Sequence, residues 1–261
     1  MDVRDTSDSS TRNRLDDRII ERCEDIPAEP DPGDYVVVDT MHFSNTVIEL
    51  LANGAEHVHI TDERGEEFAY REANPRARIG GASTEDYEPA EGYDFFNSPT
   101  YVQGLDVDGR PVSMTSSNGG RAVARLRACG GPEVDVYVGS PMNARALGTH
   151  LRGRDRTTRV VSAGSGGSTA IEDHVGATLV SRYVDGVPLA ETELDLFRRQ
   201  LKRAKGLDYV ARDDIRRRDV LDYAMAINAR SVIPRLDGES LVDVGSPQRA
   251  AASVGRTVGS D

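Results

Sequence analysis

Short apolar runs alternate with amphipathic segments through the middle of the chain. The first run, at 35–38, is one Tyr followed by three Val, and Asp39 comes directly after it. Such a run is typical of a strand that is buried on both faces. Similar runs predict further strands at 58–61, 112–115, 134–138, 160–163 and 231–233. Apolar residues at helical spacing predict helices at 47–52, 121–128, 142–151, 171–183, 190–204 and 217–229.

The regular succession of strands and helices indicates the fold class. Repeated strand–helix units favour parallel strands whose connecting helices cover the sheet. We therefore expect an α/β fold with a largely parallel or mixed β-sheet and helices on both faces, a three-layer α/β/α arrangement. Residues 34–244 are expected to form this domain. The polar segment 1–33 is predicted to be an N-terminal tail with at most a short helix at 15–24, and 245–261 a C-terminal tail.

The charge balance adds an expectation about the protein's surroundings. The chain carries 44 acidic and 32 basic side chains, and every basic one except Lys202 and Lys205 is Arg. A net charge of −12 with almost no lysine favours adaptation to high salt, with an ordinary acidic enzyme as the alternative. The basic run 198–218 is interleaved with Asp, so we interpret it as a solvated helical face, which disfavours nucleic acid as a partner.

Location and redox chemistry follow from features that the sequence lacks. No apolar run approaches the roughly 20 residues of a membrane span, and no signal sequence opens the chain, so a cytoplasmic location without a membrane partner is expected. Cys23 and Cys129 are the two cysteines, which is too few for a disulfide framework or a zinc site.

Four segments rich in small and polar residues leave predicted strands and run directly into predicted helices. They are 39–46, 115–120, 139–143 and 162–168. In an open α/β sheet, ligands bind in the crevice at the carboxyl ends of the strands. Free backbone N–H groups and positive helix ends would meet there, which predicts a site for a phosphate or another anion. The segment 162–168 lacks the Lys and spacing of a P-loop and the glycine pattern of a dinucleotide site, so neither ATP nor NAD is expected.

Three acidic residues at these strand and helix ends are candidates for chemistry. Asp39 ends a buried strand, a position from which a carboxylate commonly holds Mg²⁺ or attacks phosphorus. Glu172 completes a capping box with Thr169, and Asp173 lies in the first turn of the same helix. Both of these residues therefore also have a purely structural interpretation.

A series of motifs spans about 34–240. They are Asp39 with Ser44-Asn45-Thr46, 51–55, Gly92-Tyr93-Asp94 with Asn97-Ser98-Pro99, 115–122, 138–144, 162–164, Ile171-Glu172-Asp173, and Asp219-Val220 through Ile233-Pro234. In this order, they resemble the 2-phosphosulfolactate phosphatase family, Mg²⁺-dependent enzymes that make sulfolactate on the way to coenzyme M. The chain departs from the family pattern where His42 and Ile79 stand in place of Arg, the bidentate partner of phosphate and sulfonate oxygens.

The resemblance implies hydrolysis of a phosphate monoester, 2-phosphosulfolactate, with Mg²⁺ held by Asp39, Glu172 and Asp173. Asp39 would be a nucleophile or only a metal ligand, and His42 an acid or base or an incidental loop residue. Two alternatives stay open: a phosphatase with a changed phosphoester substrate, and a non-catalytic anion-binding protein. The expected partner is a small anionic phosphoester, and the resemblance is compatible with a homodimer. The implied substrate-binding residues are Ser44, Asn45, Thr46, Asn97, Ser98, Asn118, Gly119, Ser140, Asn143, Gly164 and Ser165.

Overall fold

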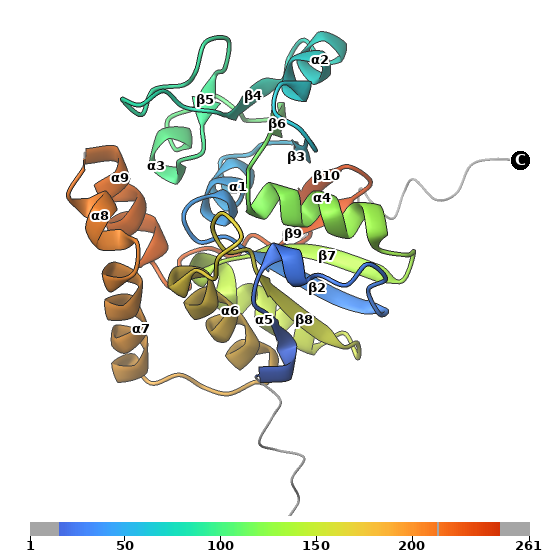
Figure 1. Cartoon of the computed structure of the whole chain (residues 1–261), viewed down its shortest axis with the longest axis vertical. Helices are drawn as coiled ribbons and strands as arrows, with labels where there is room; N and C mark the ends of the chain where they lie inside the picture. The colour runs from blue at the N-terminus through green and yellow to red at the C-terminus, as the bar shows by residue number, and fades with distance from the viewer. Residues whose placement is uncertain (1–15, 213, 246–261) are drawn as a thin grey trace, which may run out of the picture.

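The computed structural model describes residues 16–212 and 214–245, and the strands in this part of the chain form one mixed sheet (Figure 1). The strands are β1 (Ile19–Ile20), β2 (Gly33–Val38), β3 (His57–Ile60), β4 (Arg78–Gly81), β5 (Phe95–Phe96), β6 (Pro111–Met114), β7 (Val134–Gly139), β8 (Thr158–Ser162), β9 (Pro234–Asp237) and β10 (Ser240–Asp243). The α-helices are α1 (Phe43–Ala52), α2 (Glu66–Ala73), α3 (Pro99–Val102), α4 (Gly119–Cys129), α5 (Ala144–Arg152), α6 (Ile171–Val184), α7 (Glu191–Arg203), α8 (Gly206–Val210) and α9 (Asp214–Arg218). Single turns are η2 (Asp16–Arg18), η3 (Cys23–Asp25), η4 (Pro141–Asn143) and the π-helical η5 (Asp219–Ala224).

The sheet consists of two parallel groups of strands that an antiparallel hairpin joins. Across the sheet the order is β1-β8-β2-β7-β9-β10-β3-β6-β4-β5. The first four strands are parallel to one another, and so are the last four. Between them, β9 runs antiparallel to β7 and β10 antiparallel to β3. The expected α/β fold with a mixed sheet is confirmed.

Alternate side chains of β2 enter two hydrophobic cores, one on each face of the sheet. Tyr35 and Val37 pack with residues of α1 and α4, whereas Val36 and Val38 pack with residues of α5 and α6. All four side chains are fully buried. Because successive residues of a strand point to opposite faces, this strand anchors both layers of helices. The three layers that the sequence predicts are therefore present.

Residues 16–33 belong to the fold, so the prediction of a tail over 1–33 is wrong for this part. β1 extends the sheet by pairing in parallel with β8. Cys23 and Ile26 are buried in the core near α4. A strand of two residues has no periodicity to detect, which explains why the polar composition concealed it. Residues 1–15 lie outside the described residues.

The C-terminal part of the fold also differs from the expectation. The segment 231–233 forms no strand; instead β9 begins at Pro234, and the chain turns at Gly238, where φ is +62°, into β10. Val232 and Ile233 are buried, so their apolar character reflects core packing without strand pairing. The helix predicted at 217–229 is shorter and divides between α9 and η5. Beyond Gly245, the predicted C-terminal tail lies outside the described residues.

A helical arm, which we define as α7, α8, α9 and η5, lies along one edge of the molecule (Figure 1). The arm packs on α6 through α7 and on α3 through α9 and η5. It therefore connects the part of the fold around β8 with the part around β5. No helix in the described ranges is long and apolar enough to cross a membrane.

Candidate active site

Two carboxylates tie together the loops that follow β2, β6 and β8. Asp39, directly after β2, accepts a hydrogen bond of 2.8 Å from the Gly119 N–H at the start of α4. Asp173, in the first turn of α6, accepts bonds of 2.7 Å from the Thr40 N–H and 3.0 Å from the Gly164 N–H. The first bond joins the loop after β2 to the start of the helix that follows β6, and these two strands belong to different parallel groups. Three of the four predicted loops thus meet at one point.

Glycine is required at both loop positions that donate to these carboxylates. A Cβ atom on Gly119 would lie 2.4 Å from the Phe43 ring and 2.8 Å from the Cβ atom of Asp39. Gly164 has a φ of +75°, and a Cβ atom there would lie 2.4 Å from the Ser168 carbonyl oxygen. The main chain reaches the carboxylates because no side chain intervenes.

Burial raises the pKa of both aspartates. Asp39 is 4% exposed, and burial raises its pKa to about 6, although the Gly119 N–H and the positive charge of Lys205 oppose the shift. Asp173 is buried too, and burial with the negative charges of Asp39 and Glu172 raises its pKa well above the usual range. Glu172 is equally buried. A cluster of three buried carboxyl groups is stabilised by a proton or by a nearby cation.

His42 lies at the N-terminus of α1, beside this cluster. The side chain is buried, and neither ring nitrogen has a hydrogen-bond partner among the described residues. Its ring centroid lies 5.1 Å from that of Tyr209 in α8. Burial, helped by the positive charges of Arg216 and Lys205, holds the pKa of His42 well below its usual value. The imidazole is therefore neutral at pH 7 and does not supply the positive charge of the Arg that the sequence resemblance implies at this position.

Lys205, between α7 and α8, brings a cation from the arm to the carboxylates. Its Nζ atom donates a hydrogen bond of 2.8 Å to the Ser165 hydroxyl and lies 3.9 Å from a carboxylate oxygen of Glu172. The sequence indicated a solvated helical face over 198–218, and at this position that interpretation is wrong. The one feature of the sequence that distinguishes Lys205 from the arginines around it is that lysine occurs only twice in the chain.

Arg216 is a second cation of the arm that the interpretation as a solvated face missed. Its guanidinium donates to the Asn97 carbonyl and to the Asp219 carboxylate, each at 3.0 Å. It also lies over the rings of Tyr87, 4.8 Å away, and Phe96, 5.1 Å away. Nearly every position around it in the sequence is charged, so helical spacing does not distinguish this inward-facing Arg from its solvated neighbours.

Most of the predicted substrate-binding side chains hold the loops in place. The Ser44 hydroxyl accepts a bond from the Asp39 N–H, and the Asn45 amide donates to the Thr40 carbonyl. The buried Thr46 hydroxyl donates to the His42 carbonyl. The buried Ser98 hydroxyl caps α3 and donates to Asp219. Ser140 and Asn143, also buried, form a capping box at η4. These contacts give the side chains positioning roles, and their direct contact with a substrate stays a prediction.

The remaining predicted substrate-binding residues connect two of the loops near solvent. The Asn118 side-chain oxygen accepts a 3.4 Å bond from the Gly166 N–H, which joins the loop after β6 to the loop after β8. Both Asn118 and Ser165 are half-buried. Asn97 is half-buried as well, and its carbonyl is held by Arg216. Asn118 and Ser165 therefore lie between the buried cluster and solvent, and their contact with a substrate stays a prediction.

A cavity of about 320 Å³ opens beside the loop after β6. It lies at the carboxyl ends of β3 and β6, close in sequence to Gly119, and it offers hydroxyl groups and guanidinium groups. Its volume suits a small ligand. The lining residues are Asp62, Arg64, Thr115, Ser116, Ser117 and Arg121.

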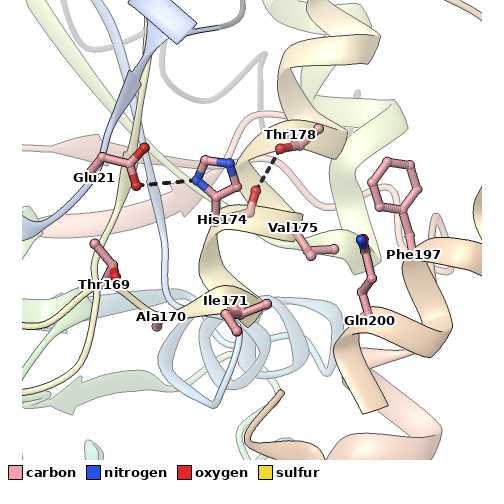
Figure 2. Close-up of a pocket in the computed structure, with 9 residues that line it drawn as sticks. All are labelled: Glu21, Thr169, Ala170, Ile171, His174, Val175, Thr178, Phe197 and Gln200. Atoms are coloured by element: carbon pink, nitrogen blue, oxygen red, sulfur yellow. Dashed lines mark hydrogen bonds and ion pairs between the residues drawn. The ribbon is translucent and has the colours of Figure 1, made fainter. Parts of the chain in front are cut away.

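A second cavity, of about 370 Å³, lies between α6 and α7 (Figure 2). Its walls include the pair of His174 and Glu21, 3.4 Å apart, and the apolar side chains of Val175 and Phe197. None of the three buried carboxylates lines either cavity. The smaller cavity lies beside the loop that leads to Gly119, whose N–H binds Asp39, whereas the larger one lies beside the start of α6.

The acidic cluster fits a metal ion through only part of its carboxylates. Within residues 16–212 and 214–245, no group of three or more His, Cys, Asp or Glu side chains is arranged to hold a metal ion. Asp173 engages both of its oxygens with backbone N–H groups. Asp39 and Glu172 remain as donors from the predicted set. Mg²⁺ commonly binds through one or two carboxylates together with phosphate oxygens, so these two side chains are compatible with it.

The fold and the site define an α/β protein whose buried carboxylates, backbone N–H donors and cations meet at strand ends. Such a meeting point suits a ligand that carries a phosphate group. The family model for 2-phosphosulpholactate phosphatase matches residues 20–239, and the chain belongs to this family. The resemblance seen in the sequence motifs is thereby confirmed, and the match begins inside the segment that the sequence had suggested was a tail.

Individual relatives agree with the family assignment. The chain is 32% identical over 182 residues to the "Probable 2-phosphosulfolactate phosphatase" of Symbiobacterium thermophilum, an alignment that covers 68% of this chain and 76% of the relative. It is 29% identical over 164 residues to the protein of the same name from Deinococcus radiodurans, covering 62% of this chain and 66% of that relative.

Proposed function

We propose that the chain is a phosphatase that hydrolyses 2-phosphosulfolactate to sulfolactate and phosphate. The observation that carries the proposal is the position of Asp39: a buried carboxylate, held by the Gly119 N–H, at the junction of the two parallel groups of strands. Membership of the family and the names of the relatives support this substrate. A place in coenzyme M biosynthesis belongs to the same proposal.

The hydrolysis breaks the bond between phosphorus and the ester oxygen. The new bond to phosphorus comes from water, or first from Asp39 and then from water, and the leaving alkoxide takes a proton. Asp39 is mostly ionised at pH 7 with a pKa of about 6, as either role requires. Neutral His42 is suited to hold or pass a proton, because it carries no charge of its own there.

Mg²⁺ is the metal we propose, with Asp39 and Glu172 as its protein ligands. Bound with phosphate oxygens, it would neutralise charge on the phosphoryl group. Backbone N–H groups of the loops after β6 and β8 would bind the phosphate, and the cavity of about 320 Å³ would receive the rest of the substrate. The Ser140 and Met142 N–H groups of the loop after β7 are instead bonded within the capping box at η4. The guanidinium groups of Arg64 and Arg121 in that cavity suit further anionic groups of the substrate.

Phosphate release tests the proposal directly. The assay compares 2-phosphosulfolactate with an aryl phosphate and a panel of other phosphoesters, in molar KCl, with and without Mg²⁺. We expect Mg²⁺-dependent release that is fastest from 2-phosphosulfolactate. Release from another ester alone would assign a changed substrate. No release from any ester, by protein whose folding is shown by circular dichroism, would contradict the phosphatase proposal.

The replacement of the family's Arg by a neutral His42 favours a second candidate, a protein that binds an anion without turnover. Phosphate binding by calorimetry separates the two. In a binding protein, Asp39→Asn keeps or tightens phosphate binding and there is no turnover to lose. In an enzyme, the same substitution removes the turnover of the unsubstituted chain.

The surroundings of the protein form a separate part of the proposal. The acidic, lysine-poor composition supports a cytoplasmic protein adapted to high salt. In that case, the melting temperature rises as KCl is increased from 0.1 to 2 M, and an unchanged melting temperature would contradict the adaptation. Light scattering in the same buffers tests the homodimer.

A further inference from the structure

We propose that Lys205 binds the phosphoryl oxygens of the substrate through its ammonium group. The inference rests on the proposed function, since it assigns a residue of the arm to the same site. It identifies a determinant of anion recognition outside the motifs that carry the family resemblance, because Lys205 lies between Asp173 and Asp219 in the sequence.

The Lys205 ammonium group lies beside a buried carboxylate and is itself partly exposed. The side chain is 37% exposed, whereas the Glu172 side chain beside it is 6% exposed. The ammonium thus lies at the boundary between the buried carboxylates and solvent, where an anion entering from outside would arrive. Its charge acts on Asp39 and on His42 as well as on Glu172, so it lies within electrostatic reach of two of the three carboxylates and of the imidazole.

The Lys205 ammonium group has more N–H donors than its hydrogen bond to Ser165 uses. An ammonium group has three N–H donors. One of them binds the Ser165 hydroxyl at 2.8 Å, and the 3.9 Å separation from Glu172 is an ion pair too long for a hydrogen bond. Donors therefore remain for phosphate oxygens. Ser165 follows Gly164, whose N–H holds Asp173, so the contact fixes the ammonium to one of the predicted phosphate-binding loops.

The neighbouring cations are less suited to this task. Arg216 is buried, is committed to the Asn97 carbonyl and to Asp219, and lies over aromatic rings. The imidazole of His42 is neutral. Among the cations that act on His42, Lys205 is the one with a partly exposed charged group.

The structure also explains how the arm places this residue. Lys205 precedes α8, and the next residue, Gly206, is buried against α7, where a Cβ atom would lie 2.9 Å from the Leu201 carbonyl oxygen. This close approach fixes the turn between α7 and α8. Lys205 therefore reaches the loops from a defined position.

Amine modification tests the inference on the unsubstituted protein. Reductive methylation, read at each site by mass spectrometry, is followed with and without inorganic phosphate. Lys202, the other lysine, is exposed on α7 and serves as the internal control. We expect saturating phosphate to slow modification of Lys205 about tenfold and to leave Lys202 unchanged. Equal rates at Lys205 with and without phosphate would overturn the inference.

Three variants test the same residue by kinetics. Lys205→Met is expected to raise KM for the phosphoester about 10- to 100-fold, the range for loss of one charge-assisted hydrogen bond. Lys205→Arg is expected to recover most of the loss, and Lys202→Met to change nothing. An unchanged KM in Lys205→Met would overturn the inference.

The two experiments keep the two proposals apart. If the unsubstituted protein releases no phosphate from any ester, the proposed function fails, yet protection of Lys205 by phosphate still supports this inference. If the enzyme is active and Lys205 is neither protected nor needed, the inference fails alone.

Discussion

The two regions that meet at Asp39 hold their charged groups in different ways. The strand-end loops hold carboxylates through main-chain donors, among them the Gly119 N–H for Asp39 and the Thr40 and Gly164 N–H groups for Asp173. The arm holds its cations through side chains, as with Arg216 against Asp219 and the Tyr87 ring. Main-chain donors are fixed once the strands pair, whereas a side-chain site depends on how helices pack. The acidic half of the site is therefore a property of the sheet, and the cationic half a property of the docked arm.

The buried ion pair of Arg216 and Asp219 anchors the arm, and breaking it is expected to have the largest effect on the free energy of unfolding. Arg216→Met removes the cation that neutralises Asp219, a fully buried carboxylate that also accepts a bond from Ser98. Leaving such a charge without its partner costs about 3–5 kcal/mol of the free energy of unfolding. Urea unfolding followed by circular dichroism measures the loss.

Arg217 provides a matched control for this experiment. It is the next residue in the same helix, its side chain is 50% exposed, and it pairs with the exposed Asp214. Arg217→Met is expected to change the free energy of unfolding by less than about 1 kcal/mol. Similar losses in both variants would show that docking of the arm does not depend on the buried pair.

The acidic half can be tested by the pH dependence of stability. Folding raises the pKa of Asp39 from 3.8 to about 6, so between these values the folded chain binds more protons than the unfolded chain. Stability contributed by this group is therefore lost as the pH rises from about 4 to about 6, by about 2–3 kcal/mol. Asp39→Asn keeps an oxygen for the Gly119 N–H and removes the titration.

The measurement is the difference in the free energy of unfolding between the two proteins from pH 4 to pH 7.5. We expect Asp39→Asn to be the more stable at pH 7 and the difference to vanish toward pH 4. The comparison separates Asp39 from the groups that titrate alike in both proteins. Asp173 is the exception, because removing the Asp39 charge also lowers the pKa of Asp173. A difference independent of pH would contradict the assigned pKa.

Gly119→Ala tests the main-chain contact that holds Asp39. The added Cβ atom would lie 2.4 Å from the Phe43 ring, so helix α4 or the ring must move. Overpacking of this kind costs about 1–3 kcal/mol, against the gain that Ala usually brings to a helix. The rate of phosphate release and the free energy of unfolding in urea should both decrease. Gly131→Ala, where nothing lies within 4 Å, is the control and should affect neither.

His42 lies where the two regions meet, and its replacement is expected to have the smallest effect on stability. His42→Phe keeps a ring beside Tyr209 and removes two nitrogens that lack partners among the described residues. We expect the free energy of unfolding to change by less than about 1 kcal/mol. Phosphate release should fall about 10²-fold if the imidazole moves a proton. Unchanged release would leave His42 as an incidental loop residue.

The acidic half of the site was predictable from local sequence, and the cationic half was not. A run of four buried residues before Asp39 is enough to place that carboxylate at a strand end. Lys205 contacts Ser165, 40 residues earlier, and Arg216 contacts Asn97, 119 residues earlier, and no local pattern encodes such distances. The hairpin of β9 and β10 was missed for a related reason: apolar Val232 and Ile233 mark the core next to the strand and not the strand itself.

The proposed reaction depends most on Asp39, and turnover and anion binding measured on one Asp39→Asn preparation test the role of this carboxylate most directly. The variant should be folded at pH 7, should bind inorganic phosphate at least as tightly as the unsubstituted protein, and should release phosphate from 2-phosphosulfolactate about 10²–10⁴-fold more slowly. Turnover within a few-fold of the unsubstituted protein would contradict the claim that this carboxylate is the reactive centre.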